Sequence, residues 1–509
     1  MSKLQVHEAI LLTDTRVAMK RPWWRILTLC SLFSLSVLIY ILLIHTSPQN
    51  DDPIAPFLHV WMISFLPYFA ACAFVLATKP LAGKWRWIEV GIIVLGAFIL
   101  RIMLLPLPPG LSPDSWRYLW DARVTLHGFS PYVYAPWSRE LAALQHTFLY
   151  TNSRFRNVPT IYPPGAQIVY LISYVLAPEN LYFLKGLFVI FDMVTCVALI
   201  VLLGRKGLDQ RRVILYAWCP LPIIEFAIQG HVDVITLTFT ILAILAASNH
   251  SVRGYMLTGF LIGVATLTKI YPILLLVVIL PDIDDKDAPV MQRIRYHYVP
   301  LIGSCFATIM IGYVPYLILG HGQAFGFFAA YASEQGQNAG VTQQIVHWLG
   351  DRLRLPLTKT ITLEHLVDVF VIGTASVIVF ALRWRNRISV EAGTLILFGV
   401  ILSISSHVFP WYTTILLLWV PVLVGPFWSH TGLAGRGLAV IAVWYFTATA
   451  LLSYFFNSAQ GISIDWTVYY RLVYWPVIVA LCVAALIGSM NFLRFRKRVR
   501  YARCSTKYS

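Results

Sequence analysis

The chain has 509 residues, of which 58% are hydrophobic and only 12% are charged, and its mean hydropathy is +0.70. This composition excludes an ordinary soluble domain and predicts a polytopic membrane protein. The formal net charge of +16 fits the same class, because basic residues gather in the cytoplasmic loops of membrane proteins. We therefore interpret the positive charge as a topology signal and expect no nucleic-acid partner.

The first two apolar runs lie near residues 25–45 and 57–78, and each is long enough to cross about 30 Å of hydrocarbon. The first run follows a polar segment and has no small-residue cleavage site, so it predicts a signal anchor. The sequence thus indicates an N-terminal helix pair in residues 1–80, a membrane core in 81–490 and a basic tail in 491–509.

Further apolar runs continue along the core. Because backbone polar groups must be satisfied inside lipid, these runs predict helices. Together they indicate an all-α, polytopic membrane bundle of about 12–14 transmembrane helices. The predicted spans lie near 88–105, 181–203, 212–228, 232–248, 298–319, 363–383, 390–405, 411–427, 435–453 and 470–490.

The distribution of Lys and Arg orients the bundle. With the N-terminus in the cytoplasm, most basic residues fall in cytoplasmic segments, including the tail from Arg494 to Lys507. A cytoplasmic C-terminus requires an even number of crossings. The interrupted apolar stretch 255–281 is therefore expected to form two half-length helices that turn at Lys269–Pro272.

On this topology the unusual polar residues share the extracytoplasmic face. The largest such segment, residues 106–165, holds Asp114 and Asp121 seven residues apart, with Arg117 and Tyr118 between them. On a helix this spacing places both carboxylates on one side. Two interpretations are open. Asp114 caps a short helix while Asp121 pairs with Arg117 or Arg123, or Asp114 is a general base kept ionised by the arginines.

Two proline-flanked aromatic elements follow in the same segment. Tyr132 lies in Ser130–Pro136, and Tyr162 precedes Pro163 and Pro164, so neither can lie in a regular helix interior. Tyrosines at this depth are either ordinary residues of the interfacial aromatic belt or faces on which a sugar ring stacks. Their position beside the carboxylates is compatible with the second role.

Isolated polar residues also mark the ends of several spans. His231 and Asp233 lie between two apolar runs, either as a capped turn or as functional groups. Lys269 requires an anionic partner, for which a lipid phosphate and Asp233 are the two candidates. Arg471 near the outer end of the last span and His407 before Pro410 are weaker candidates.

The seven cysteines are scattered without CxxC spacing, which argues against a structural zinc site and a disulfide framework. One acidic cluster without His or Cys support is no metal signature, so we expect no metal site and leave a divalent cation open as a cofactor.

The order of these segments resembles the GT-C superfamily of multi-spanning glycosyltransferases, and most of all the bacterial polyprenyl-phosphate-mannose-dependent mannosyltransferases. The likeness extends from residue 106 to 412. The segments that carry it are Asp114–Arg123, Gly128–Tyr132, Tyr162–Pro164, Gly230–Asp233, Lys269–Pro272 and His407–Tyr412.

This resemblance implies transfer of a sugar, mannose by analogy, from a polyprenyl-phosphate donor to an extracytoplasmic glycan or glycolipid, usually with inversion. Asp114, or alternatively Asp121, matches the base of the family. The resemblance also implies a multi-pass protein of the bacterial plasma membrane with both termini in the cytoplasm. The residues it suggests for the donor phosphate are Arg117, Lys269, Tyr271 and Arg471, and those for the sugar or acceptor are Tyr118, Tyr132, Tyr162, His231, Asp233, His407 and Tyr412.

Two departures from the family pattern are visible. The key loop follows the third span instead of the first, and no large soluble C-terminal domain is apparent, which leaves acceptor recognition to the loops at 320–362 and 454–469. A transporter or flippase for lipid-linked sugars or anions is the alternative function. It is less favoured because the ionisable residues gather on one face rather than at the midplane of a repeat.

Overall fold

The computed structural model describes residues 23–48, 53–283, 289–334, 338–425, 436–456 and 466–505. Within these residues every regular element is a helix, which confirms the predicted all-α class. The basic residues before Trp23, and parts of the loops after Ala332 and Phe456, fall outside the described residues.

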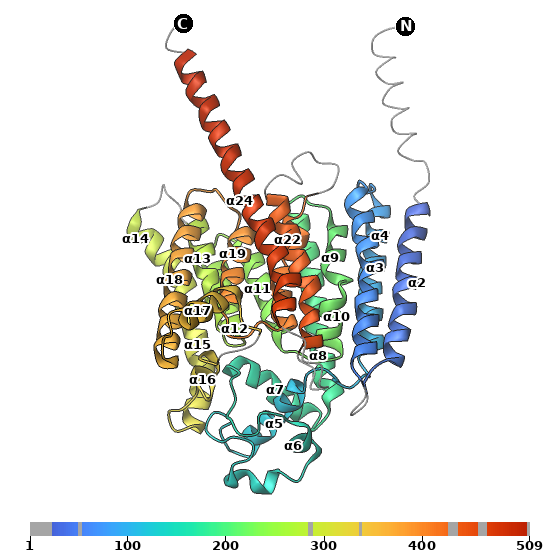
Figure 1. Ribbon diagram of the computed structural model, residues 1–509, viewed down its shortest axis with the longest axis vertical. Coiled ribbons are helices and arrows are strands. Elements are labelled where there is room, and N and C mark those ends of the chain that lie inside the picture. Colours follow the sequence, from blue (N-terminus) through green and yellow to red (C-terminus); the bar gives the residue numbers. More distant parts are fainter. Residues whose placement is uncertain are drawn as a thin grey trace.

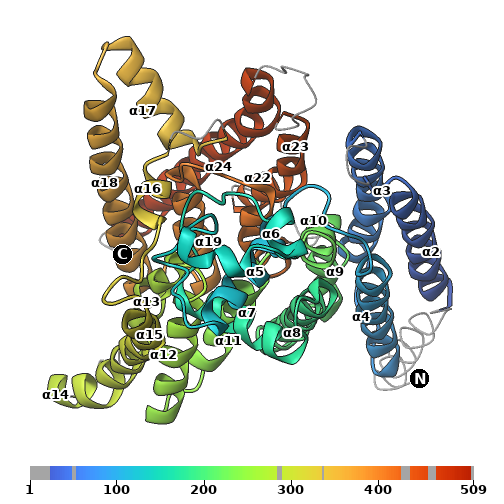
Figure 2. The same cartoon turned by 90° about the horizontal axis from the view of Figure 1, so that it is seen from below.

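The first three helices form one side of the molecule (Figure 2). They are α2 (Trp23–His45), α3 (Ala55–Ala77) and α4 (Lys84–Leu104). A buried charge cluster ties them to the turn η2 (Gln210–Val213): Glu89 of α4 lies 3.0 Å from Arg25 of α2 and 3.3 Å from Arg211 of η2. Since an unpaired buried charge is very costly, this cluster fixes the helices against the core.

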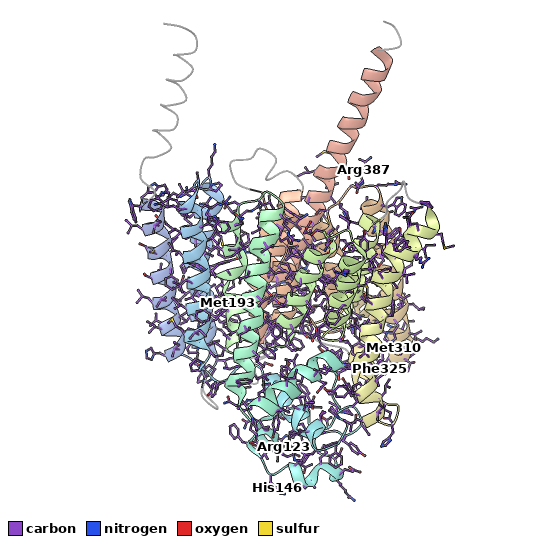
Figure 3. The ribbon with its side chains drawn as sticks, turned by 180° about the vertical axis from the view of Figure 1, so that it is seen from behind. Arg123, His146, Met193, Met310, Phe325 and Arg387 are labelled. Carbon is purple, nitrogen blue, oxygen red and sulfur yellow. The ribbon has the colours of Figure 1, made fainter. Side chains whose placement is uncertain are left out.

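The polar segment forms a cap at one end of the bundle (Figure 1) and covers its centre when seen from that end (Figure 2). Its elements are α5 (Asp114–Leu126), η1 (Arg139–Leu144), α6 (Phe148–Asn152) and α7 (Pro164–Leu176). Arg123 and His146 lie at this end, whereas Arg387 lies at the opposite end (Figure 3). Helix α2 begins and α24 (Trp466–Ser505) ends at the end opposite to the cap (Figure 1).

The helices behind the cap are α8 (Leu181–Arg205), α9 (Ile214–Ala217), α10 (Pro220–Ala227) and α11 (Asp233–Ala247). The prediction of one continuous span at 212–228 is wrong, because this stretch is divided into η2, α9 and α10. Pro220 and Pro222 lack the N–H groups that a continuous helix needs. At membrane depth, such breaks are tolerated only where the surrounding protein buries them. Residues 211–238 are all buried.

The predicted interruption of 255–281 is confirmed. Helix α12 (Val252–Thr266) ends before Lys269, and the chain resumes with three short pieces, η3 (Tyr271–Leu274), α13 (Leu275–Ile279) and η4 (Leu280–Ile283). Helix α12 packs closely on α15 (Val299–Leu319), since a Cβ on Gly259 would lie only 2.0 Å from the carbonyl oxygen of Leu301. Between α13 and α15 lie α14 (Val290–Arg293) and η5 (Ile294–Tyr298).

The C-terminal part completes the bundle. The predicted span at 411–427 lies in the described residues as far as 425, and there the prediction of one continuous helix is wrong, because the stretch forms short pieces, the last of which begins beside Pro421. The elements are α16 (Phe328–Ala332), α17 (Val341–Arg352), α18 (Leu357–Trp384), α19 (Val390–Ser403), η6 (Pro410–Thr413), α20 (Thr414–Leu417), α21 (Val420–Leu423), α22 (Arg436–Thr449), η7 (Ala450–Leu452), α23 (Ser453–Phe456) and α24.

Eight helices in the described part of the chain are long and apolar enough to cross a membrane, and shorter apolar helices lie among them. The chain is thus an integral, multi-pass membrane protein. The estimate of about 12–14 crossings counted several buried segments that the structure shows as short or broken helices.

The two ends of the bundle can be assigned to the two sides of the membrane by labelling. We expect a membrane-impermeant maleimide to label His146→Cys in intact cells, and Arg387→Cys only after permeabilisation, because these residues lie at opposite ends (Figure 3). The parent protein is the control. Its exposed Cys30 and Cys482 lie in apolar helices, so its labelling gives the background. Labelling of Arg387→Cys alone in intact cells would reverse the predicted orientation.

Candidate functional site

Asp114 is the first residue of α5, as the preceding proline predicted, but Pro113 occupies the cap position and no side chain caps the helix, so the interpretation of Asp114 as a helix cap is wrong. Its carboxylate accepts a hydrogen bond from the Tyr162 hydroxyl at 3.2 Å, and its side chain remains 19% exposed. Burial raises the pKa of Asp114 above its usual value, while the Tyr162 hydrogen bond and the charge of Lys269 act in the opposite direction. An accessible carboxylate of increased basicity therefore lies where the cap meets the bundle.

Asp121 has different surroundings. It is buried, and its two oxygens face the Nε of Arg117 at 2.8 Å and the amide of Gln167 at 3.1 Å. Arg117 also donates to the carbonyl oxygens of Phe155 and Val158 at 2.9 and 3.0 Å. Of the ion pairs considered from the sequence, the one with Arg117 is present. Internal contacts thus occupy both side chains and hold residues 155–158 against α5.

Three of the tyrosines in the cap form a layer behind Asp114. Tyr118 stacks on Tyr170 at 4.4 Å between ring centroids and meets the ring of Tyr162 edge-on at 4.9 Å. Tyr132 donates to the carbonyl oxygen of Tyr162 at 2.7 Å. Tyr118 and Tyr132 are buried, whereas the hydroxyl of Tyr162 donates to the Asp114 carboxylate.

Lys269 lies beside this layer, in the break after α12. Its Nζ is 3.3 Å from the carboxylate of Asp233, 4.5 Å from the ring centre of Tyr412 and 5.9 Å from that of Tyr162. The Asp233 partner considered from the sequence is therefore present. The Lys269 side chain keeps 17% of its surface exposed, so it remains accessible to a further anion.

A stack of flat side chains extends from the site toward α16. Trp411 lies on His231, with centroids 3.7 Å apart, and Phe409 lies on Trp411 at 4.5 Å. His407 stacks on Phe409 at 5.7 Å and contacts Tyr331 at 5.1 Å. His407 and Phe409 alternate in the irregular segment before η6, where alternate side chains of an extended backbone point to one side, and Trp411 follows within η6. This alternation could have revealed the stack in the sequence.

Tyr331 contacts the tyrosine that packs against Lys269. Its hydroxyl lies 3.0 Å from that of Tyr412, whose ring covers the lysine. His407 is fixed by Asn338 and Glu334, each at 3.2 Å. The segment after α15 thus reaches the site that the cap and the broken helices form.

Glu225 was missed by the sequence analysis. It is fully buried in α10, 3.3 Å from the Nε2 of His231, and accepts hydrogen bonds from Tyr454 at 3.1 and 3.2 Å. Its signal was a carboxylate inside an apolar run, which is costly unless it is paired or used.

Lys185 is a second charged residue inside an apolar run that was not predicted as part of the site. It is buried in α8 and donates to the carbonyl oxygens of Leu107 and Ile228, which joins the start of the cap to the turn before His231. In that turn Gly230 has φ +71°, and a Cβ there would lie 3.0 Å from the Lys185 side chain. Only glycine fits this backbone and this space.

Two further candidates were predicted for the donor phosphate. Tyr271 packs edge-on against Phe398 at 5.0 Å and lies near enough to Asp233 to feel its charge, whereas Arg471 is exposed on α24. In the part of the chain that the structure describes, no group of three or more His, Cys, Asp or Glu side chains is arranged to hold a metal ion.

One family model matches part of the chain. Residues 160–410 match the model of glycosyltransferase family 87. The match includes Tyr162, His231, Asp233, Lys269 and His407 but not Asp114. It indicates glycosyltransferase activity and supports the GT-C-like class of integral membrane enzymes. The search of curated proteins finds no match to this chain.

The contrast between Asp114 and Asp121 leads to a stability prediction. Arg117→Ala leaves the buried Asp121 without its partner, so we expect a loss of about 3–5 kcal/mol, seen as a lower unfolding temperature of the detergent-solubilised protein. The matched control is Arg123→Ala, because Arg123 pairs at 2.6 Å with the 40% exposed Glu179. That loss should be about 1 kcal/mol or less. Equal effects of the two variants would contradict the structural role of Arg117.

Proposed function

We propose that this chain transfers a sugar from a polyprenyl-phosphate donor to an extracytoplasmic glycan or glycolipid acceptor, with inversion at the anomeric carbon. The observation that carries the proposal is the position of Asp114, an accessible carboxylate 3.2 Å from the Tyr162 hydroxyl, beside a partly exposed lysine at the membrane end of the cap. Mannose is the sugar suggested by the resemblance to the polyprenyl-phosphate-mannose-dependent enzymes.

Asp114 is the general base in this proposal. It removes the proton from the acceptor hydroxyl while that oxygen forms a bond to the anomeric carbon and the bond to the lipid phosphate breaks. The electron pair of the broken bond stays with the phosphate oxygen. A base acts best when its pKa approaches the working pH, and burial raises the pKa of Asp114 in that direction.

Lys269 holds the donor phosphate. A phosphate leaving group needs a cation more than an acid, because negative charge develops on it as the bond breaks. Lys269 lies where a break in the helix reaches the cap, and Asp233 at 3.3 Å orients its ammonium group. Tyr162 and Tyr412 flank this lysine and supply aromatic faces for the sugar.

Arg117 and Asp121 support the site instead of contacting substrate, because their polar atoms are engaged inside the cap. We assign acceptor recognition to the two segments that carry Tyr331 and His407, which contact each other beside Tyr412.

The reaction class can be tested by transfer of labelled mannose from synthetic polyprenyl-phosphate-mannose to glycan or glycolipid acceptors in proteoliposomes. Asp114→Asn should lower the rate by about 10²–10⁴-fold, the usual contribution of a general base, without loss of stability. The matched control is Glu140→Gln, an exposed carboxylate in the same segment. Movement of labelled lipid across the bilayer without any transfer would favour a flippase instead.

The pH dependence of transfer follows from the raised pKa of Asp114. The base is active when ionised, so kcat/KM should fall as the pH drops through this pKa, at a higher pH than for an ordinary aspartate. A profile that stays flat down to the normal range of aspartate would contradict this assignment.

Lys269→Met should weaken donor binding by roughly tenfold or more, since a charge-assisted contact to phosphate is lost. It also leaves Asp233 buried without a partner, so the double variant Lys269→Met with Asp233→Asn serves as the control for stability. The double variant should regain stability but not donor affinity, measured as binding of labelled donor. Recovered affinity would return Lys269 to a structural role.

A further inference from the structure

His231 lies between two carboxylates, inside the protein. Its Nδ1 is 3.9 Å from Asp114 and its Nε2 is 3.3 Å from Glu225, and the side chain is completely buried. Neither ring nitrogen makes a well-formed hydrogen bond within the described residues. Leaving both polar atoms of a buried imidazole without a hydrogen bond is costly, so a use for them is expected.

The imidazole cannot easily turn away from this position. Trp411 covers one face of the ring, with centroids 3.7 Å apart and the planes tilted by only 12°. The backbone is fixed too, because the N–H of His231 donates to the carbonyl oxygen of Glu225 at 3.0 Å. The positive φ of Gly230 sets the turn that precedes it. The ring therefore keeps one nitrogen toward each carboxylate.

Glu225 lies on the inner side of His231, opposite to Asp114. Both of its oxygens accept hydrogen bonds from Tyr454, which comes from α23. Three parts of the chain, α5, α10 with the turn that follows it, and α23, thus align Asp114, His231, Glu225 and Tyr454 in this order from the accessible end inward.

We propose that His231 is a positioning and proton-relay residue that acts through Asp114. This inference rests on the proposed transferase function and extends it. After Asp114 has taken the proton of the acceptor hydroxyl, that proton passes to Nδ1 of His231 while the proton on Nε2 passes to Glu225. The relay holds the proton inside the protein while the products leave. The two protons then return along the same path, and the partly exposed Asp114 releases the acceptor proton to solvent, which restores its carboxylate for the next turnover.

The present distances are compatible with this role. The separation of 3.9 Å between His231 and Asp114 is longer than a hydrogen bond, but catalytic hydrogen bonds are often long without substrate and tighten in the reacting complex. A small rotation of the Asp114 side chain is sufficient, since it is the partly exposed member of the pair.

Other groups also act on the charge of Asp114. The Tyr162 hydroxyl and Lys269 stabilise the ionised form, whereas Asp233 opposes it. These groups stay unchanged in the variants below, so a shift in the pH profile reports on His231. The remaining groups that face this region are Ser112, Tyr118, Glu225, Tyr331 and Tyr454.

Two substitutions of His231 separate proton relay from simple hydrogen bonding. Gln can accept a hydrogen bond from protonated Asp114 through its amide oxygen but cannot pass the proton on, and Phe can do neither. The relay predicts that kcat falls by about 10²-fold in both His231→Gln and His231→Phe. The acid limb of kcat/KM should move to lower pH mainly in His231→Phe, because protonated Asp114 then loses the Nδ1 acceptor that favours its protonated form.

Glu225→Gln tests the inner end of the relay. The substitution removes the proton acceptor for Nε2, while the glutamine side chain can still form a hydrogen bond with Tyr454. We expect a lower kcat with an unchanged acid limb. His127→Gln, an exposed histidine at the end of α5, should leave kcat unchanged. Full activity in His231→Gln, or in Glu225→Gln, would overturn the relay.

A spectroscopic measurement tests the contacts of His231 without requiring catalysis. In the full-length protein labelled with ¹⁵N-histidine, the His231 signals are identified by their loss in His231→Gln. Asp114→Asn and Glu225→Gln should each change the tautomer populations of His231, with His127 as the unaffected reference. His231 signals that respond to neither variant would overturn the relay. A response without sugar transfer from any lipid donor would overturn the proposed function while the contacts stand.

Discussion

The site depends on the requirement that backbone polar groups inside a membrane protein be satisfied. Helices stop early at three places, at Ala227, Thr266 and Ser403, and the chain continues as turns or extended segments. Such irregular backbone is allowed because neighbouring helices and the cap bury it. These breaks place His231, Lys269 and His407 at the junction of cap and bundle, where uninterrupted helices would carry apolar side chains.

Buried ion pairs secure this arrangement. Arg101 and Asp192 lie 2.6 Å apart inside the bundle, and Tyr216 donates to the same carboxylate at 2.6 Å. The Arg117–Asp121 pair does the same for the cap. Because breaking such a pair leaves an unpaired buried charge, each one favours a single packing of its helices. At the junction of the bundle with the cap, the side chains of Asp114 and Lys269 both remain partly exposed.

The two aspartates of the cap differ in their exposure and in their partners. Asp114 and Asp121 belong to the same helix, yet their surroundings differ: Asp121 is held by two internal donors, whereas Asp114 meets one hydroxyl and keeps an exposed face. The match to glycosyltransferase family 87 includes the breaks that carry Lys269 and His231. In the proposed reaction, the cap supplies the base and the bundle supplies the cation that holds the donor phosphate.

The sequence by itself determined the membrane class, the all-helical fold and the polar segment at residues 106–165, because apolar runs and prolines act locally. It also predicted the break before Tyr271 and the start of α5 at Asp114. Only the tertiary structure decided which charges pair, since Glu225 reaches Tyr454 across 229 positions of the chain. It also revealed that the stretches at 212–228 and 411–425 are broken helices, because hydropathy reports burial but does not distinguish burial in lipid from burial in protein.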